Sequence, residues 1–216
     1  YSFRYAMKLV IATPSPFARK VRVVLREKEI DFEEIIDVPW NRDTICRSFN
    51  PLGKIPVLLQ EGKEPLFDSS IIVQHIESMN KMPAMYPVSQ EDAMLARIIE
   101  TTADGICDAL VLISLENMRK ETLRSKDWTE RQSAKIYNGI EYLSNKLGNE
   151  IYFVGEIFTI ADVASFSCLE YLDLRFPEFE WRSEYPNLEN YWQKHENRRS
   201  FSETRPAAQV IEPLNN

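Results

Sequence analysis

A single serine stands between two prolines at the start of a predicted helix, in the stretch TPSPFARKVRVVL over residues 13–25. Serine accepts a hydrogen bond from a free backbone N–H at a helix N-cap, and proline favours the first helical position, so Ser15 and Pro16 fit a simple helix start. The same helix end favours a thiolate, to which a hydroxyl can donate. Ser15 is therefore either a plain cap or the group that activates the thiol of a bound ligand.

A second candidate is the stretch KIPVLL over residues 54–59, where Pro56 opens a predicted strand. Proline cannot donate a ladder hydrogen bond, so it fits the first residue or the edge of a strand. A cis proline is the other interpretation, and it would expose the backbone of Ile55 for pairing with an extended ligand. The two residues alone do not choose between these interpretations.

A third candidate is FDSSII over residues 67–72, at another junction between a strand and a helix. Asp68 can hold an ammonium group, and Ser69 at the helix N-terminus can hold a carboxylate. Together they suit the α-amino acid end of a ligand, with a plain helix cap as the alternative. The two histidines, His75 and His195, both fall in predicted helices, where a structural role is more common.

The elements around these junctions divide the chain into two halves. The first half predicts strands at 7–12, 32–38, 55–59 and 65–67, a helix after TPSP and a second helix over 69–79. The strand, helix and strand up to residue 38 form a βαβ unit. A proline-containing linker at 80–90 leads into an all-helical half, with helices predicted over 91–124, around 136–147, over 161–174 and over 188–195.

Composition narrows the class of protein. The 216 residues carry a formal net charge of −7, and 44% are hydrophobic, which is typical of a globular protein with a sizeable core. Residues 85–216 hold 14 Lys and Arg against 22 Asp and Glu, so we expect no nucleic-acid partner. No run is apolar enough for a membrane span, and no signal peptide is visible. The three cysteines are far apart, which indicates a reducing compartment.

Taken together, the junctions resemble the cytosolic glutathione transferases, bacterial members in particular. The resemblance extends from about Met7 to Pro206 and rests on four motifs in order: SPFARKVR, FNPLGKIPVL, DSSII and FTIADVA. It implies a thioredoxin-like α/β domain over 7–82 and an all-α domain over 90–210. It also implies a cytoplasmic homodimer without a metal site, which uses glutathione as co-substrate and transfers it to a small electrophile, as in detoxification.

The resemblance also assigns residues to roles. Ser15 matches the activating serine of the tau- and zeta-like classes, and Thr159 with Asp162 matches a structural capping box in the helical domain. The residues implied to bind glutathione are Lys54, Ile55, Pro56, Asp68 and Ser69, with Asn41 or Arg42 as alternatives to Lys54 for the glycine carboxylate. The residues implied for the electrophile are Thr13, Phe17, Asp104 and Asp108.

Departures from the family pattern leave alternatives. No cysteine lies between residues 12 and 20, which disfavours glutaredoxin-like chemistry, and PSP replaces the zeta-like SSC. Tyr5 precedes the first strand and is a poor substitute for an activating tyrosine, whereas Thr13 competes with Ser15. The alternatives to a transferase are a glutathione-binding protein with peroxidase, disulfide reductase or negligible activity, and a scaffold that has lost the thiol site.

Overall fold

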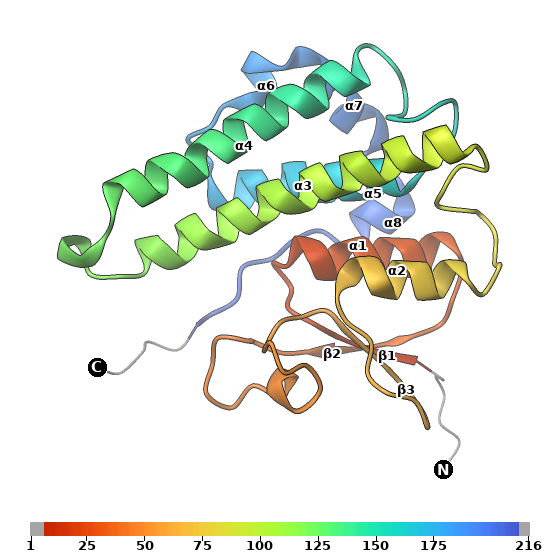
Figure 1. Ribbon diagram of the computed structural model, residues 1–216, viewed down its shortest axis with the longest axis horizontal. Helices are drawn as coiled ribbons and strands as arrows, with labels where there is room; N and C mark the ends of the chain where they lie inside the picture. The colour runs from red at the N-terminus through yellow and green to blue at the C-terminus, as the bar shows by residue number, and fades with distance from the viewer. Residues whose placement is uncertain (1–6, 212–216) are drawn as a thin grey trace. The chain divides into compact units, whose positions relative to one another are not determined.

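The computed structural model describes residues 7–211, which fall into two compact units (Figure 1). Within this range the first unit comprises residues 7–84 and 199–211, and the second comprises residues 85–198. Tyr5 and the rest of the first six residues lie outside the described part of the chain. The mixed sheet with helices in the first unit and the helical second unit confirm the predicted fold class.

A three-stranded sheet forms the base of the first unit, in the order β2–β1–β3. Its strands are β1 (Met7–Ile11), β2 (Glu33–Ile36) and β3 (Val57–Gln60). β1 runs parallel to β2, with Val10 opposite Ile35, and antiparallel to β3, with Leu9 opposite Leu58. Leu9, Val10 and Leu58 are fully buried. Strands that are buried in this way are apolar along their length, so they can be recognised in the sequence.

The predicted strand at 65–67 is wrong. Only Leu66 pairs with the sheet, through two backbone hydrogen bonds to Leu58 of 2.9 and 3.0 Å. Pro65 has no N–H to donate, so the ladder cannot extend on that side. The chain then turns at Asp68 into the next helix.

Helices cover one face of the sheet, where α1 and α2 lie side by side (Figure 1). The helical elements of this unit are α1 (Pro16–Glu27), the 3₁₀ turn η1 (Cys46–Ser48), α2 (Ser69–Glu77) and the short α8 (Arg199–Ser202). The apolar residues of α1 recur at helical spacing and face the sheet, so Val21, Val24 and Leu25 are fully buried.

The C-terminal stretch packs with the first unit, although the sequence placed it in the helical half. Arg19 of α1 donates to the carbonyl of Phe201 at 3.1 Å, and Arg22 donates to the carbonyl of Thr204 at 3.4 Å. Ser200 donates to the carboxylate of Glu27. These contacts hold α8 against α1 (Figure 1).

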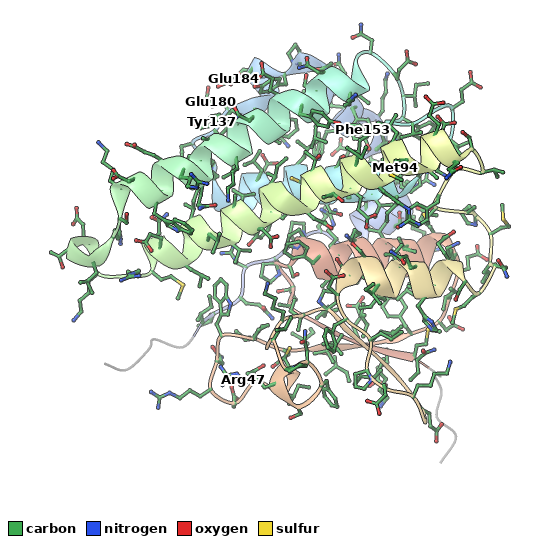
Figure 2. The ribbon with its side chains drawn as sticks, viewed as in Figure 1. Arg47, Met94, Tyr137, Phe153, Glu180 and Glu184 are labelled. Carbon is green, nitrogen blue, oxygen red and sulfur yellow. The ribbon has the colours of Figure 1, made fainter. Side chains whose placement is uncertain are left out.

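The second unit is entirely helical. Its helices are α3 (Gln90–Asn117), η2 (Glu121–Leu123), α4 (Lys126–Leu147), α5 (Ile160–Arg175), α6 (Trp181–Glu184) and α7 (Pro186–His195). α5 is buried over 160–172 and packs against α3. α4 approaches α3 closely at Gly139, where an added Cβ would lie 2.5 Å from Ile106. Tyr137 extends from α4 (Figure 2), and its ring centroid lies 4.4 Å from that of Phe179.

The long helix predicted over 91–124 ends earlier, at Asn117. Arg124 explains the end, because its guanidinium donates to the carbonyls of Asn117 at 2.7 Å and Arg119 at 3.0 Å. The last carbonyl groups of a helix have no N–H partner within the helix, and a cation beside them satisfies these acceptors. Ser125 then caps α4, accepting from the N–H of Trp128 at 3.3 Å.

Candidate functional site

Ser15 is the N-cap of α1, as the sequence predicts. Its Oγ accepts from the N–H of Ala18 at 3.1 Å, and its own N–H donates to the carbonyl of Ala12 at 3.0 Å. In the cap bond the hydroxyl is an acceptor, so its proton is not used there. Within residues 7–211 the Ser15 hydroxyl donates no hydrogen bond, which leaves its proton available to a ligand at the N-terminus of α1.

Thr13, the competing hydroxyl, is already bonded within the protein. Its Oγ1 donates to the carbonyl of Ala207 at 2.9 Å, and the N–H of Ala207 donates back to the Thr13 carbonyl at 3.3 Å. A hydroxyl has one proton, so this pair occupies the donor of Thr13. Thiol activation requires a hydroxyl proton that is not already used in a hydrogen bond. Ser15 has such a proton, whereas Thr13 does not.

The peptide bond between Ile55 and Pro56 is cis, one of the two interpretations of this junction. The carbonyl of the preceding Lys54 accepts two hydrogen bonds, from Cys46 Sγ at 3.0 Å and Asn50 Nδ2 at 2.7 Å. Because N–H and C=O point in opposite directions across a trans peptide, these bonds aim the N–H of Ile55 away from Cys46 and Asn50. No described residue bonds to that N–H, so it can pair with a ligand.

The two residues that orient this peptide, Cys46 and Asn50, were not predicted from the sequence. Asn50 has a local signal, since its Oδ1 accepts from the N–H of Leu52 at 2.9 Å in an Asx turn of the kind that Asn before Pro favours. Cys46 has no such signal. Burial, and then the nearby carboxylate of Asp37, raise the pKa of its thiol. The thiol therefore stays protonated and can donate to Lys54.

Asp68 caps α2, and Ser69 is the first residue of the helix. Oδ1 of Asp68 accepts from the N–H groups of Ser70 at 3.1 Å and Ile71 at 3.4 Å. Asp68 is exposed, whereas Ser69 is 3% exposed. The cap therefore uses one oxygen of the carboxylate, which leaves Oδ2 to accept from an incoming donor. The peptide bond between Phe67 and Asp68 is also cis.

Thr159 and Asp162 form the predicted capping box at the start of α5, and the structure confirms it. Thr159 Oγ1 accepts from Ala161 N at 3.3 Å, while the Asp162 carboxylate accepts from Thr159 N at 2.9 Å and Phe153 N at 3.1 Å. Burial raises the pKa of Asp162 to about 6. The hydrogen bonds just named, and one from Tyr191, act in the opposite direction and lower the pKa. Every partner is part of the helical unit, so this site is structural.

Two family models match the chain. The N-terminal domain of glutathione S-transferase matches residues 14–79, and the C-terminal domain of glutathione S-transferase matches residues 126–193. This chain belongs to the glutathione S-transferase family. The first match covers the three junctions at Ser15, Ile55 and Asp68, and the second covers the capping box at Asp162.

Relatives and solved structures agree with that assignment. The chain is 38% identical to the "uncharacterized GST-like protein YibF" of Escherichia coli K12, over 93% of this chain and 98% of the relative. It superposes with TM-score 0.93 on a glutathione S-transferase from Methylobacterium radiotolerans JCM 2831 in complex with glutathione sulfonate, at 41% identity over 95% and 97% of the two chains. A transferase from Methylobacillus flagellatus KT with glutathione bound gives 0.89, at 35% identity over 93% and 100%.

The residues implied for the electrophile in this transferase family are divided between the units. Thr13 and Phe17 belong to the first unit, whereas Asp104 and Asp108 lie on α3 in the second. Phe17 and Asp104 are half-buried, and Asp108 is exposed. The electrophile site that would combine the four residues stays a prediction.

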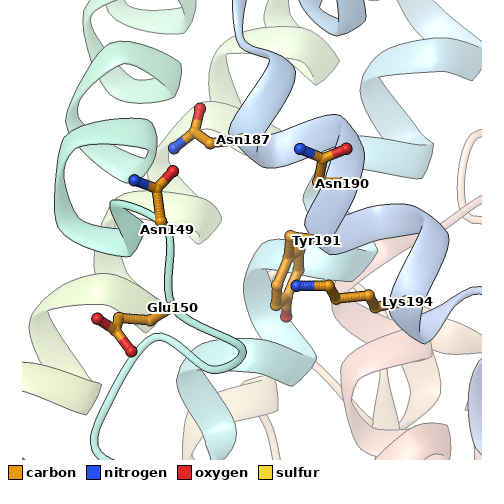
Figure 3. Close-up of a pocket in the computed structure, with 6 residues that line it drawn as sticks. All are labelled: Asn149, Glu150, Asn187, Asn190, Tyr191 and Lys194. Carbon is orange, nitrogen blue, oxygen red and sulfur yellow. The ribbon is translucent and has the colours of Figure 1, made fainter.

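A polar pocket lies within the helical unit, and none of its lining residues is among those that the resemblance implies for glutathione or the electrophile (Figure 3). It is lined by Asn149, Glu150, Asn187, Asn190, Tyr191 and Lys194. Two of these residues are engaged in the fold. Asn187 Nδ2 donates to the carbonyls of Ser144 and Gly148, and the Tyr191 hydroxyl donates to Asp162.

The described part of the chain shows neither a metal-binding cluster nor a membrane-spanning helix. Over residues 7–211, no group of three or more His, Cys, Asp or Glu side chains is placed to hold a metal ion. Within the same range, no helix is long and apolar enough to cross a membrane. His75 and His195 lie in α2 and α7 as predicted, and burial lowers the pKa of both side chains.

Proposed function

We propose that this protein binds glutathione on its first unit and transfers it, through its sulfur atom, to an electrophilic small molecule. The observation that carries the proposal is Ser15, a hydroxyl with a proton to donate at the N-terminus of α1. Glutathione sulfonate in the structure of one relative and glutathione in that of another support the choice of ligand. We expect the protein to act in the cytoplasm as a homodimer, as the resemblance implies.

In this proposal each junction holds one part of glutathione. The N–H of Ile55 pairs with the cysteinyl unit, because it lacks a partner within residues 7–211. Asp68 accepts from the γ-glutamyl ammonium through Oδ2, and Ser69 with the N-terminus of α2 holds the neighbouring carboxylate. The exposed Lys54 reaches the glycine carboxylate, with Asn41 or Arg42 as alternatives.

The chemical step follows from the thiol position. Ser15 donates to the sulfur, and the N-terminus of α1 adds its free N–H groups, so the thiolate is favoured over the thiol. The thiol proton leaves to solvent, a carbon–sulfur bond forms, and the electrophile loses its leaving group or takes up a proton. Thr13, Phe17, Asp104 and Asp108 are the residues proposed to contact the electrophile.

A calorimetric titration with glutathione, followed by the ultraviolet thiolate absorbance of the complex across pH, tests the proposal. We expect binding with a thiol pKa well below that of free glutathione, and then turnover in a screen of electrophiles. Binding with an unshifted pKa would favour a glutathione-binding protein with negligible transfer. Activity confined to peroxides or mixed disulfides would favour the peroxidase or disulfide reductase alternative. No binding at millimolar glutathione would leave the fold as a scaffold.

A further inference from the structure

The C-terminal residues 205–211, here called the strap, follow a firmly anchored point. Thr204 is 1% exposed and is fixed to α1, since its Oγ1 accepts from Arg19 Nε at 3.3 Å and its carbonyl accepts from Arg22. The strap has no helix or strand of its own. The path of the strap is therefore determined by the hydrogen bonds that its polar groups form.

Those bonds lie next to the candidate thiol-activating turn. Ala207 and Thr13 exchange two hydrogen bonds, one from the Thr13 hydroxyl at 2.9 Å and one from the Ala207 N–H at 3.3 Å. Thr13 is two residues before Ser15, and the intervening Pro14 has no N–H to add a bond. The turn at residues 12–15 thus has one internal bond, from Ser15 N to Ala12 O, two bonds in which Ser15 accepts from the N–H groups of α1, and two bonds to the strap.

The strap also bonds to the loop after β2. Gln209 Nε2 donates to the carbonyl of Asp37 at 3.2 Å. The carboxylate of Asp37 accepts from Thr44 Oγ1 at 2.6 Å and from Cys46 N at 3.1 Å. Cys46 in turn donates to the carbonyl of Lys54, which orients the N–H of Ile55. One segment therefore contacts the turn before Ser15 directly and is connected to the Lys54–Ile55 peptide through Asp37 and Cys46.

We infer that the strap positions two groups for glutathione: the Ser15 hydroxyl for thiol activation, through Ala207, and the N–H of Ile55 for binding, through Gln209. This inference rests on the proposed function. Donation to a thiolate depends on the direction of the hydroxyl, and that direction depends on the backbone of the turn. With the strap released, Ser15 keeps its bond to Ala12 and its two bonds to α1, but Thr13 loses both of its bonds to Ala207, and the Ser15 hydroxyl donates to the sulfur for a smaller part of the time.

The test compares variants of the full chain by the thiol pKa of bound glutathione, read from ultraviolet thiolate absorbance, together with kcat and KM. Thr13→Val removes the hydroxyl donor, and Ala207→Pro removes the N–H donor. We expect each to raise the thiol pKa by about half to one unit. The double variant should add little to either single change, because both release the same strap.

Two controls separate positioning from general damage. Thr13→Ser keeps the hydroxyl and should restore the thiol pKa of the parent protein. Thr129→Val removes a hydroxyl that donates to the Ser125 carbonyl in the helical unit, and it should leave the thiol pKa unchanged. Gln209→Ala releases the other end of the strap, so it should mainly raise KM for glutathione, by about two- to tenfold.

The outcomes distinguish the strap from the proposed function. If Thr13→Val raises the thiol pKa and Ala207→Pro does not, Thr13 acts on the thiol directly and the inference is wrong. If neither raises it while the parent protein still binds glutathione with a lowered thiol pKa, the inference is overturned and the proposed function stands. An unshifted thiol pKa in the parent protein overturns both.

Discussion

Replacement of Ser15 by alanine would remove two interactions at once, so its effect must be divided between them. The first is the N-cap bond to Ala18 N at 3.1 Å, and losing an N-cap of this kind costs about 0.5–2 kcal/mol of the free energy of unfolding. The second is the proposed hydrogen bond to the thiolate. A bond to a charged partner contributes about 1.5–3 kcal/mol, which corresponds to about one to two units of thiol pKa.

The sign of the second effect gives a distinctive pH profile. Loss of a donor to the thiolate raises the thiol pKa, so the variant holds less thiolate near neutral pH and kcat/KM falls about 10- to 100-fold there. Above the raised pKa the thiol is ionised in both proteins, and the difference should shrink. Glutathione should still bind, because Ile55 and Asp68 are unchanged. Thiolate absorbance and rates across pH measure the profile.

Matched variants separate the cap from the chemistry. Ser89 and Ser125 cap α3 and α4 in the same way, accepting from Asp92 N at 3.4 Å and Trp128 N at 3.3 Å. Ser89→Ala and Ser125→Ala should lower the free energy of unfolding by a similar amount and leave the thiol pKa unchanged. Ser15→Asp should keep the cap of α1 and still lose activation. If the Ser15→Ala protein is destabilised but the thiol pKa of bound glutathione is unchanged, the reasoning is refuted and Ser15 is only a helix N-cap.

Three further predictions concern other residues. Asp68→Asn keeps an N-cap side chain but removes the charge, so calorimetry should show glutathione binding weakened by about 10- to 100-fold; equal affinity would exclude Asp68 from the ammonium site. Cys46→Ala removes a donor to Lys54 and should raise KM for glutathione by about two- to tenfold at an unchanged thiol pKa, whereas a matching rise in Cys168→Ala would indicate general loosening. Burial raises the pKa of Asp162 from 3.8 to about 6, so the folded state binds its proton more tightly than the unfolded state and gains about 3 kcal/mol as pH falls through that window. Denaturant unfolding at a series of pH values should show this gain in the free energy of unfolding for the parent protein and not for Asp162→Asn. The same pH dependence in both proteins would contradict it.

The sequence by itself determined the features that depend on neighbours along the chain. Ser15 accepts from the N–H three residues later, and the capping box of Thr159 and Asp162 spans the same distance. Such contacts use local backbone geometry, so residue type and spacing are sufficient to predict them. The order of strands and helices followed from hydrophobic periodicity for the same reason.

The tertiary structure decided which polar groups are already occupied. Charged residues are typical of an exposed helix face, yet Arg19, Lys20 and Arg22 of α1 are buried, and Arg22 pairs with Glu34 at 2.8 Å. The structure also decided between the two interpretations of Pro56, because it shows that the peptide bond between Ile55 and Pro56 is cis.

Thr13 is the clearest case. Its hydroxyl partner, Ala207, lies 194 residues further along the chain. Contacts over that distance depend on how the C-terminal segment packs against α1, and local propensity carries no information about them. The sequence therefore left Thr13 as a competitor of Ser15, whereas the folded chain occupies the proton of Thr13 and leaves that of Ser15 available to a ligand.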